Sequence, residues 1–262
     1  YDIRKEKAAK SGKHRQMIGC VVLIRILMSG CNGKMGQVIT RLAEQYDELR
    51  ITAGYDISDS GKNGYPVFTD LKSFNSEADV IIDFSNPAAL EGLLDFAIER
   101  KLPIIVATTG LSPAQKNLLH AASQKIPVFS SANMSLGVNL VIDLVKKAAR
   151  LLESNFDIEI IEKHHNQKLD APSGTALAIA DSINEVLEQK HEYVYDRHSR
   201  RKKRSRAEIG IHALRGGTIV GDHSVIFAGN DEIIEISHRS MSKDIFGTGA
   251  LRAARFIYGK KP

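Results

Sequence analysis

The chain has 262 residues, 43% of them hydrophobic, which is enough for one large domain or two ordinary ones with a sizeable core. Its two cysteines, Cys20 and Cys31, exclude a disulfide framework and suit a reducing cytoplasm, where we expect the protein to reside. The net charge of +5 comes from two basic segments, residues 1–21 and 197–206, and because neither is interleaved with base-stacking aromatic residues we expect no nucleic-acid partner.

The first 21 residues combine a basic stretch with the start of an apolar one, as a secretion signal does. Arg25 interrupts the apolar run, and the part before it, from Met17 to Ile24, spans only eight residues. We therefore expect residues 1–21 to be a leader, a tag or a misassigned start, and to be mobile. No stretch of the chain approaches the ~20 uninterrupted apolar residues that cross a bilayer, so we expect no membrane partner.

The segment up to residue 131 alternates between strand and helix patterns, which is typical of a parallel sheet with helices on both faces. Strands are expected at residues 21–28, 49–56, 78–84, 103–107 and 127–131, and helices at 37–45, 87–101 and 112–125.

The pattern changes after residue 131, where strands that mostly alternate apolar and polar residues predict an open antiparallel or mixed sheet. The strands are expected at residues 156–165, 207–215, 218–229 and 231–240, and the helices at 137–153, 173–190 and 243–259. The basic run 197–206 is expected to be an exposed loop.

A glycine-rich turn between the first strand and the first helix indicates a dinucleotide site. Gly30, Gly33 and Gly36 let the backbone turn tightly and approach a pyrophosphate, which the free N–H groups of the helix N-terminus then bind. Asp56 ends the second strand, where a carboxylate accepts hydrogen bonds from a ribose. The spacing is G-x-x-G-x-x-G rather than G-x-G-x-x-G, so a glycine-rich turn without a ligand is the alternative.

The fold class is therefore α/β, with a Rossmann-like parallel sheet followed by an α+β domain with an open mixed or antiparallel sheet. We expect residues 22–132, completed by 238–262, to bind the dinucleotide. Residues 133–237 are expected to bind the substrate and to form the oligomer contacts.

The segment 162–176, EKHHNQKLDAPSGTA, predicts a substrate site. His164 and Lys168 can both carry protons, and Ser173 is a good N-cap that places Gly174 and Thr175 in the first turn of a helix. The N–H groups of that turn form an anion site. The alternatives are a solvated polar turn and a metal site, but no ligand set with the usual spacing accompanies the histidines, so we expect no metal.

Taken in order, GCNGKMG, DFSNP, ATTG, SANMSLGVN, EKHHNQKLDAPSGTA and RGGTIVGDH resemble the motifs of the 4-hydroxy-tetrahydrodipicolinate reductase family, formerly called dihydrodipicolinate reductase. The resemblance covers about Ile24 to Gly259. It implies NAD(P)H-dependent reduction of a cyclic dicarboxylate in diaminopimelate and lysine synthesis, by a homotetramer joined through its C-terminal sheets.

The resemblance also implies roles for individual residues. His164 and Lys168 are implied as proton donors, with His165, Lys168, Gly174 and Thr175 as substrate contacts. The residues implied to bind the cofactor, NADH or NADPH, are Gly30, Cys31, Asn32, Gly33, Lys34, Met35, Asp56, Ala107, Thr108, Thr109, Ser131, Ala132, Asn133 and Met134. The remaining alternatives are another two-domain dinucleotide oxidoreductase and a non-catalytic dinucleotide-binding regulator that contacts nucleic acid through residues 197–206.

Overall fold

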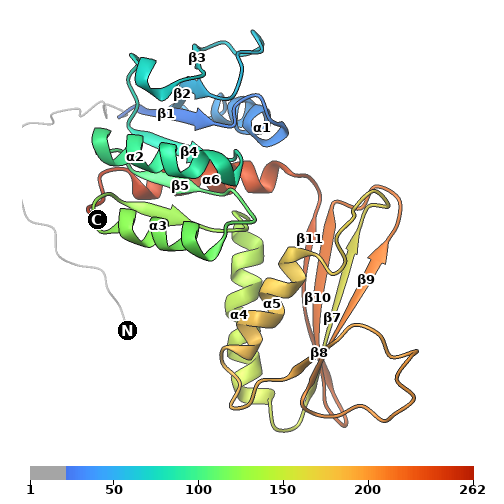
Figure 1. Ribbon diagram of the computed structural model, residues 1–262. Coiled ribbons are helices and arrows are strands. Elements are labelled where there is room, and N and C mark those ends of the chain that lie inside the picture. Colours follow the sequence, from blue (N-terminus) through green and yellow to red (C-terminus); the bar gives the residue numbers. More distant parts are fainter. Residues whose placement is uncertain (1–21) are drawn as a thin grey trace, which may run out of the picture.

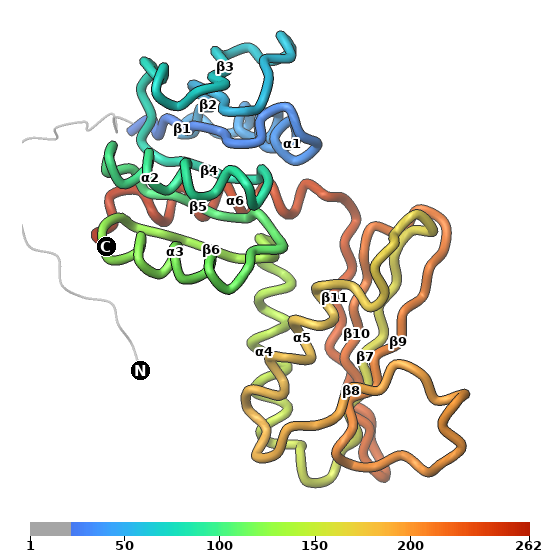
Figure 2. Tube along the Cα trace, viewed as in Figure 1, coloured from blue at the N-terminus to red at the C-terminus, as the bar shows by residue number. Residues whose placement is uncertain are grey.

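The computed structural model describes residues 22–262, which form two α/β units side by side, each built on its own sheet (Figure 1, Figure 2). The expectations for residues 1–21 lie outside the described residues. Within the described part, no helix is long and apolar enough to cross a membrane.

The first sheet has six parallel strands in the order β3-β2-β1-β4-β5-β6. Its strands are β1 (Ile24–Ser29), β2 (Leu49–Tyr55), β3 (Val67–Phe68), β4 (Val80–Asp83), β5 (Ile104–Val106) and β6 (Val128–Ser130). The order reverses direction at β1, so the carboxyl ends of β1 and β4 border the crevice where such sheets bind ligands.

Helices cover both faces of this sheet, as the alternating pattern predicted. The helices and 3₁₀ turns of this first unit are α1 (Lys34–Ala43), η1 (Leu71–Ser73), η2 (Pro87–Ala89), α2 (Leu90–Arg100), α3 (Pro113–Ser123) and α6 (Asp244–Ile257). Helices α1 and α6 pack on one face and α2 and α3 on the other, each pair around its own apolar core. The last helix of the chain thus returns to the first sheet.

In the second unit, two helices pack against a five-stranded mixed sheet of order β11-β10-β7-β9-β8. Its elements are α4 (Leu136–Leu152), β7 (Asp157–His164), α5 (Gly174–Asn184), β8 (Glu192–Val194), β9 (Glu208–Arg215), β10 (Gly221–Ala228) and β11 (Ile233–Ser240). Strand β10 pairs antiparallel with β7 and β11, whereas β7, β9 and β8 run parallel. The sheet is mixed, one of the two predicted forms.

Among residues 22–262, helices cover only one face of this second sheet. Along β7, buried residues such as Ile158 and Ile160 alternate with half-buried ones such as Ile161, and β10 alternates in the same way. The buried set packs under α4 and α5. The other face, which carries Ile161, Ile226 and Leu214, meets no helix of the described chain (Figure 1), and arginines of the loop 197–206 reach part of it.

The structure corrects several sequence expectations. The first strand begins at Ile24, not at residue 21, and Pro87 starts a 3₁₀ turn that precedes the α-helix. The short strands β3 and β8 were not predicted, because two or three residues are too few for a periodic pattern.

The basic run 197–206 is a loop, but it is only partly exposed. Arg204 donates hydrogen bonds to Glu159 and Asp157 and to the carbonyl oxygen of Ile158, and Arg197 pairs with Glu159 and the buried Glu208. These arginines neutralise acids that the sheet itself carries. Part of the run's charge is therefore internal, which weakens the alternative of a nucleic-acid contact at this loop.

Candidate active site

The glycine turn between β1 and α1 is built for close approach of the backbone. Gly30 has φ +80°, and a Cβ atom there would lie 2.5 Å from the carbonyl oxygen of Phe84. Gly33 is the N-cap of α1 and provides no side-chain cap, so the first N–H groups of α1 have no side-chain acceptor at the cap. An uncapped helix N-terminus next to a tight turn fits a dinucleotide pyrophosphate.

Asp56 faces this turn from the end of β2. Its Oδ2 accepts a hydrogen bond of 2.9 Å from the backbone N–H of Asn32, and its Oδ1 accepts one from the N–H of Ile57. A cleft of about 810 Å³ opens beside the carboxylate. It is lined by Ser29, Gly30, Asn32, Gly33, Tyr55, Asp56, Ile57, Ser58, Phe84, Ser85, Asn86, Ala88 and Ala89.

A buried carboxyl group joins the loops that follow β4 and β5. Asp83 accepts hydrogen bonds from the hydroxyl groups of Ser85 and Thr108, the second at 2.7 Å. Burial raises the pKa of Asp83, although both hydroxyl groups oppose that change. Thr108 also accepts a hydrogen bond from the N–H of Ser85. Of the sequence-predicted cofactor residues here, Ala107 and Thr108 are buried and Thr109 is exposed, and none of the three lines the cleft.

The loop after β6 connects the dinucleotide side to the predicted substrate side. Asn133 donates a hydrogen bond of 3.0 Å from Nδ2 to the Thr175 hydroxyl oxygen, and its Oδ1 accepts from the N–H of Ser135, the N-cap of α4. Since Thr175 accepts from Asn133, its own hydroxyl proton is free to point elsewhere. Within the same loop, Met134 is buried and Ala132 is exposed.

Helix α5 begins as the sequence predicted. The Ser173 hydroxyl group accepts a hydrogen bond from the N–H of Ala176, and Gly174 and Thr175 form the first turn. Ser173 is buried, whereas Gly174 is exposed, and no atom of residues 22–262 would lie within 4 Å of a Cβ atom at that position. The open first turn provides N–H groups for an anion.

His164, at the end of β7, is held by a carboxylate that the sequence reading had not placed there. Its Nδ1 lies 2.6 Å from Glu162 Oε2, and both side chains are buried. Arg215 donates a hydrogen bond of 2.7 Å to each Glu162 oxygen. Burial alone would raise the pKa of Glu162, but the hydrogen bonds from Arg215 and His164 hold it below its usual value, so the carboxylate is charged at neutral pH.

A second histidine completes the cluster. The ring of His223 meets that of His164 edge to face, with the centroids 5.2 Å apart, and its Nε2 lies 3.0 Å from the Ser173 hydroxyl oxygen. Burial, followed by the nearby His164 ring, lowers the pKa of His223 to about 4, so this imidazole is neutral at physiological pH. Its Nδ1 has no hydrogen-bond partner among the described residues.

Lys168 lies in the loop between β7 and α5. Its Nζ is 2.8 Å from Asp170, and this contact lowers the pKa of the Asp170 carboxyl group. The backbone N–H of Lys168 donates to the carbonyl oxygen of His165, a half-buried residue. No hydrogen bond joins Lys168 to His164 within residues 22–262.

Three residues of this cluster were not predicted from the sequence. Glu162 precedes His164 by two positions on an alternating strand, so the two share a face, and that spacing was the available signal. Arg215 and His223 lie in the motif RGGTIVGDH but on β9 and β10, and only the pairing of these strands with β7 brings them to His164.

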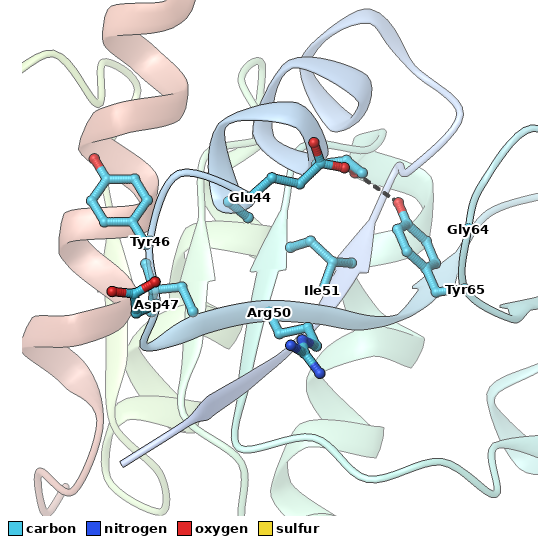
Figure 3. Close-up of a pocket in the computed structure, with 10 residues that line it drawn as sticks. Glu44, Tyr46, Asp47, Arg50, Ile51, Gly64 and Tyr65 are labelled. Carbon is cyan, nitrogen blue, oxygen red and sulfur yellow. Dashed lines mark hydrogen bonds between the residues drawn. The ribbon is translucent and has the colours of Figure 1, made fainter. Parts of the chain in front are cut away.

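A separate pocket of about 440 Å³ lies between the C-terminal end of α1 and the start of β2 (Figure 3). Glu44, Tyr46, Arg50 and Tyr65 are among its lining residues, and the Tyr65 hydroxyl group is 2.7 Å from that of Thr40. None of the predicted site residues lines it. The chemistry-bearing residues gather instead around His164 and the glycine turn.

Two family models match the chain. The one described as dihydrodipicolinate reductase, N-terminus, matches residues 24–134, and dihydrodipicolinate reductase, C-terminus, matches residues 137–262. The 4-hydroxy-tetrahydrodipicolinate reductase of Caldanaerobacter subterraneus subsp. tengcongensis is 54% identical over 92% of this chain and 95% of its own. The enzyme of the same name from Clostridium tetani is 49% identical over 91% of this chain and 93% of its own.

A solved structure also resembles this one. Dipicolinate-bound dihydrodipicolinate reductase from Paenisporosarcina sp. TG-14 superposes with a TM-score of 0.77 at 25% sequence identity, covering 92% of this chain and 96% of that one. GenD2 from gentamicin A biosynthesis, in complex with NAD, has a TM-score of 0.58 at 13% identity, covers 96% of this chain and 88% of that one, and shares the fold alone.

Proposed function

The chain belongs to the dihydrodipicolinate reductase family, and from this membership we propose that it reduces 4-hydroxy-tetrahydrodipicolinate to tetrahydrodipicolinate with NADH or NADPH, on the route to diaminopimelate and lysine. One observation carries the proposal. Glu162 contacts both the buried His164 and the N–H of Ser173, at the anion-binding start of α5. The hydrogen bond between Asn133 and Thr175 joins that start of α5 to the dinucleotide side.

The glycine turn and its surroundings fit the dinucleotide. We assign its binding to Gly30–Met35, Asp56, Ala107–Thr109 and Ser131–Met134, because the open helix N-terminus suits the pyrophosphate and the Asp56 carboxylate suits ribose hydroxyl groups. When bound, the dinucleotide supplies the hydride of the reduction. Asp56 would repel a 2′-phosphate, and Ile57 offers it no positive charge, so NADH is expected to serve at least as well as NADPH.

The reduction also needs a proton. Because the substrate carries a hydroxyl group that the product lacks, oxygen leaves as water, and the conjugated cyclic imine then takes up one hydride and one proton. We assign the proton to His164, whose Nε2 is turned away from Glu162. An imidazole serves as an acid near neutral pH, and the Glu162 carboxylate fixes the orientation of this ring through Nδ1.

The two carboxylates of the substrate require cationic and N–H partners. The first turn of α5, with Gly174 and Thr175, would take one, and Lys168 and His165 the other. Lys168 now pairs with Asp170, so binding of the substrate exchanges one carboxylate for another without leaving the ammonium unpaired. Lys168 would also share the donation of protons.

We further propose a cytoplasmic homotetramer joined through the face of the second sheet that α4 and α5 leave free. That face carries Ile161, Leu214 and Ile226 among polar residues, and a partner sheet would remove their apolar surface from water. Light scattering of the purified chain tests the stoichiometry. A monomer at micromolar concentration would contradict it.

The activity is tested with freshly made 4-hydroxy-tetrahydrodipicolinate. We expect the chain to oxidise NADH, and NADPH no faster, only in the presence of this substrate, and mass spectrometry of the product should give the mass of tetrahydrodipicolinate. Dipicolinate should inhibit competitively. Oxidation of neither dinucleotide, with the glycine turn intact and NADH bound, would overturn the proposal.

A further inference from the structure

We propose that Glu162 is the positioning residue of this site, which sets the tautomer of the proton donor and anchors the start of the anion-binding helix at the same time. The inference rests on the proposed function, because it takes His164 as the proton donor. It concerns a residue that itself reaches neither substrate nor dinucleotide.

Both oxygen atoms of Glu162 are fully engaged. Oε2 lies 2.6 Å from His164 Nδ1 and accepts from Arg215 Nη1 at 2.7 Å. Oε1 accepts from the backbone N–H of Ser173 at 3.0 Å and from Arg215 Nη2 at 2.7 Å. The side chain is completely buried. These contacts fix the carboxylate plane, so the positions of His164 and Ser173 are fixed relative to each other.

The contact to Nδ1 determines which nitrogen faces the substrate. A carboxylate without a proton can only accept, so the neutral His164 ring must carry its proton on Nδ1. The charged ring then donates from Nε2 and returns to the Nδ1–H form. Gly221 lies beside Nε2, and a Cβ atom there would be 3.0 Å from it, so the missing side chain leaves that nitrogen accessible.

Arg215 explains why the carboxylate does not take the proton itself. Its two hydrogen bonds help to hold the pKa of Glu162 below its usual value despite burial. Arg215 also donates to the carbonyl oxygen of Asp170, in the loop that carries Lys168. Arg215 and Glu162 therefore connect the end of β7, the loop after it and the N-terminus of α5.

Glu162→Gln gives a sharp test, because the partners of the side chain determine how the amide lies. The Oε1 position meets only donors, Ser173 N–H and Arg215 Nη2, whereas the Oε2 position meets His164 Nδ1, which can accept. The amide NH₂ therefore takes the Oε2 position and donates to His164 Nδ1, and Arg215 Nη1 loses its acceptor there. The neutral His164 ring is then forced into the Nε2–H form.

We expect Glu162→Gln to lower kcat about 10- to 100-fold, the range found for carboxylates that orient metal-binding histidines, with a smaller change in KM. Nitrogen NMR of labelled histidine should show the proton on Nδ1 of His164 in the wild-type enzyme and on Nε2 in the variant. Glu162→Asp, which keeps the charge, should recover part of the lost kcat. NADH affinity, followed by fluorescence, should be unchanged.

Glu208→Gln is the matched control, because Glu208 is also a buried glutamate paired with an arginine, Arg197, but at the start of β9. It should lower the melting temperature without changing kcat or the tautomer. A Glu162→Gln variant that keeps kcat within about twofold, or keeps the proton on Nδ1, would overturn the proposal. If the wild-type enzyme does not turn over, the proposed function fails, and the tautomer alone then decides the role of Glu162.

Discussion

His223 makes folding stability depend on pH in a way that can be calculated. Its pKa is lowered from 6.5 to about 4, first by burial. Between these values the unfolded chain binds a proton that the folded chain does not, so stability falls as the pH drops below 6.5. Linkage between the two pKa values gives a loss of about 2 kcal/mol at pH 5 relative to pH 8 from this residue alone.

Urea unfolding of the wild-type enzyme and of His223→Gln, at pH 8 and at pH 5 and at one protein concentration, measures this contribution. Glutamine does not titrate, and its amide can still donate to the Ser173 hydroxyl group, which now lies 3.0 Å from His223 Nε2. We expect the wild-type enzyme to lose about 2 kcal/mol more than the variant on acidification. Equal losses would mean that His223 is protonated in the folded state and that the argument from burial is wrong.

Three further substitutions, one of them with a matched control, test substrate binding, dinucleotide binding and folding stability separately. Lys168→Ala should lower kcat and raise KM, because it removes a partner of a substrate carboxylate in the ground state as well as in the transition state; an unchanged KM would place that carboxylate elsewhere. Asp56→Ser should weaken NADH binding by about tenfold or more, with less effect on NADPH, because a charged acceptor of the ribose is lost; equal effects on both dinucleotides in fluorescence titrations would contradict this role. Arg204→Met should lower the free energy of unfolding by about 2–3 kcal/mol, because it leaves Glu159 and the carbonyl oxygen of Ile158 with fewer partners, whereas the exposed Lys203→Met should change it by less than about 0.5 kcal/mol.

The periodic parts of the fold could be predicted from the sequence. Long strands and helices bury one face or one stripe, so β7 and α4 appear in the sequence as alternation and amphipathic repetition. The cap at Ser173 could also be predicted, because it depends on residues that are neighbours along the chain. The two- and three-residue strands β3 and β8 could not, since only pairing with a neighbour defines them.

The site divides in the same way. The glycine turn and the start of α5 are local. Helix α5 begins as predicted, whereas α1 begins at Lys34, so Gly36 lies in the helix rather than in the turn. The partners of His164 are not local, because Arg215 lies 53 residues from Glu162 and reaches it only through strand pairing. The exposure of the run 197–206 was overestimated for the same reason, since the acids that pair with Arg204 lie on β7.

Our main proposal is that this chain is a reductase in which His164 donates the proton. It is tested most directly by the initial rate of dinucleotide oxidation with 4-hydroxy-tetrahydrodipicolinate, compared between the wild-type enzyme and His164→Gln. We expect turnover by the wild-type enzyme and a kcat lowered ~10²–10⁴-fold in the variant, with KM and NADH affinity little changed. A wild-type enzyme without turnover, or a variant that keeps more than about a tenth of the wild-type kcat, would contradict it.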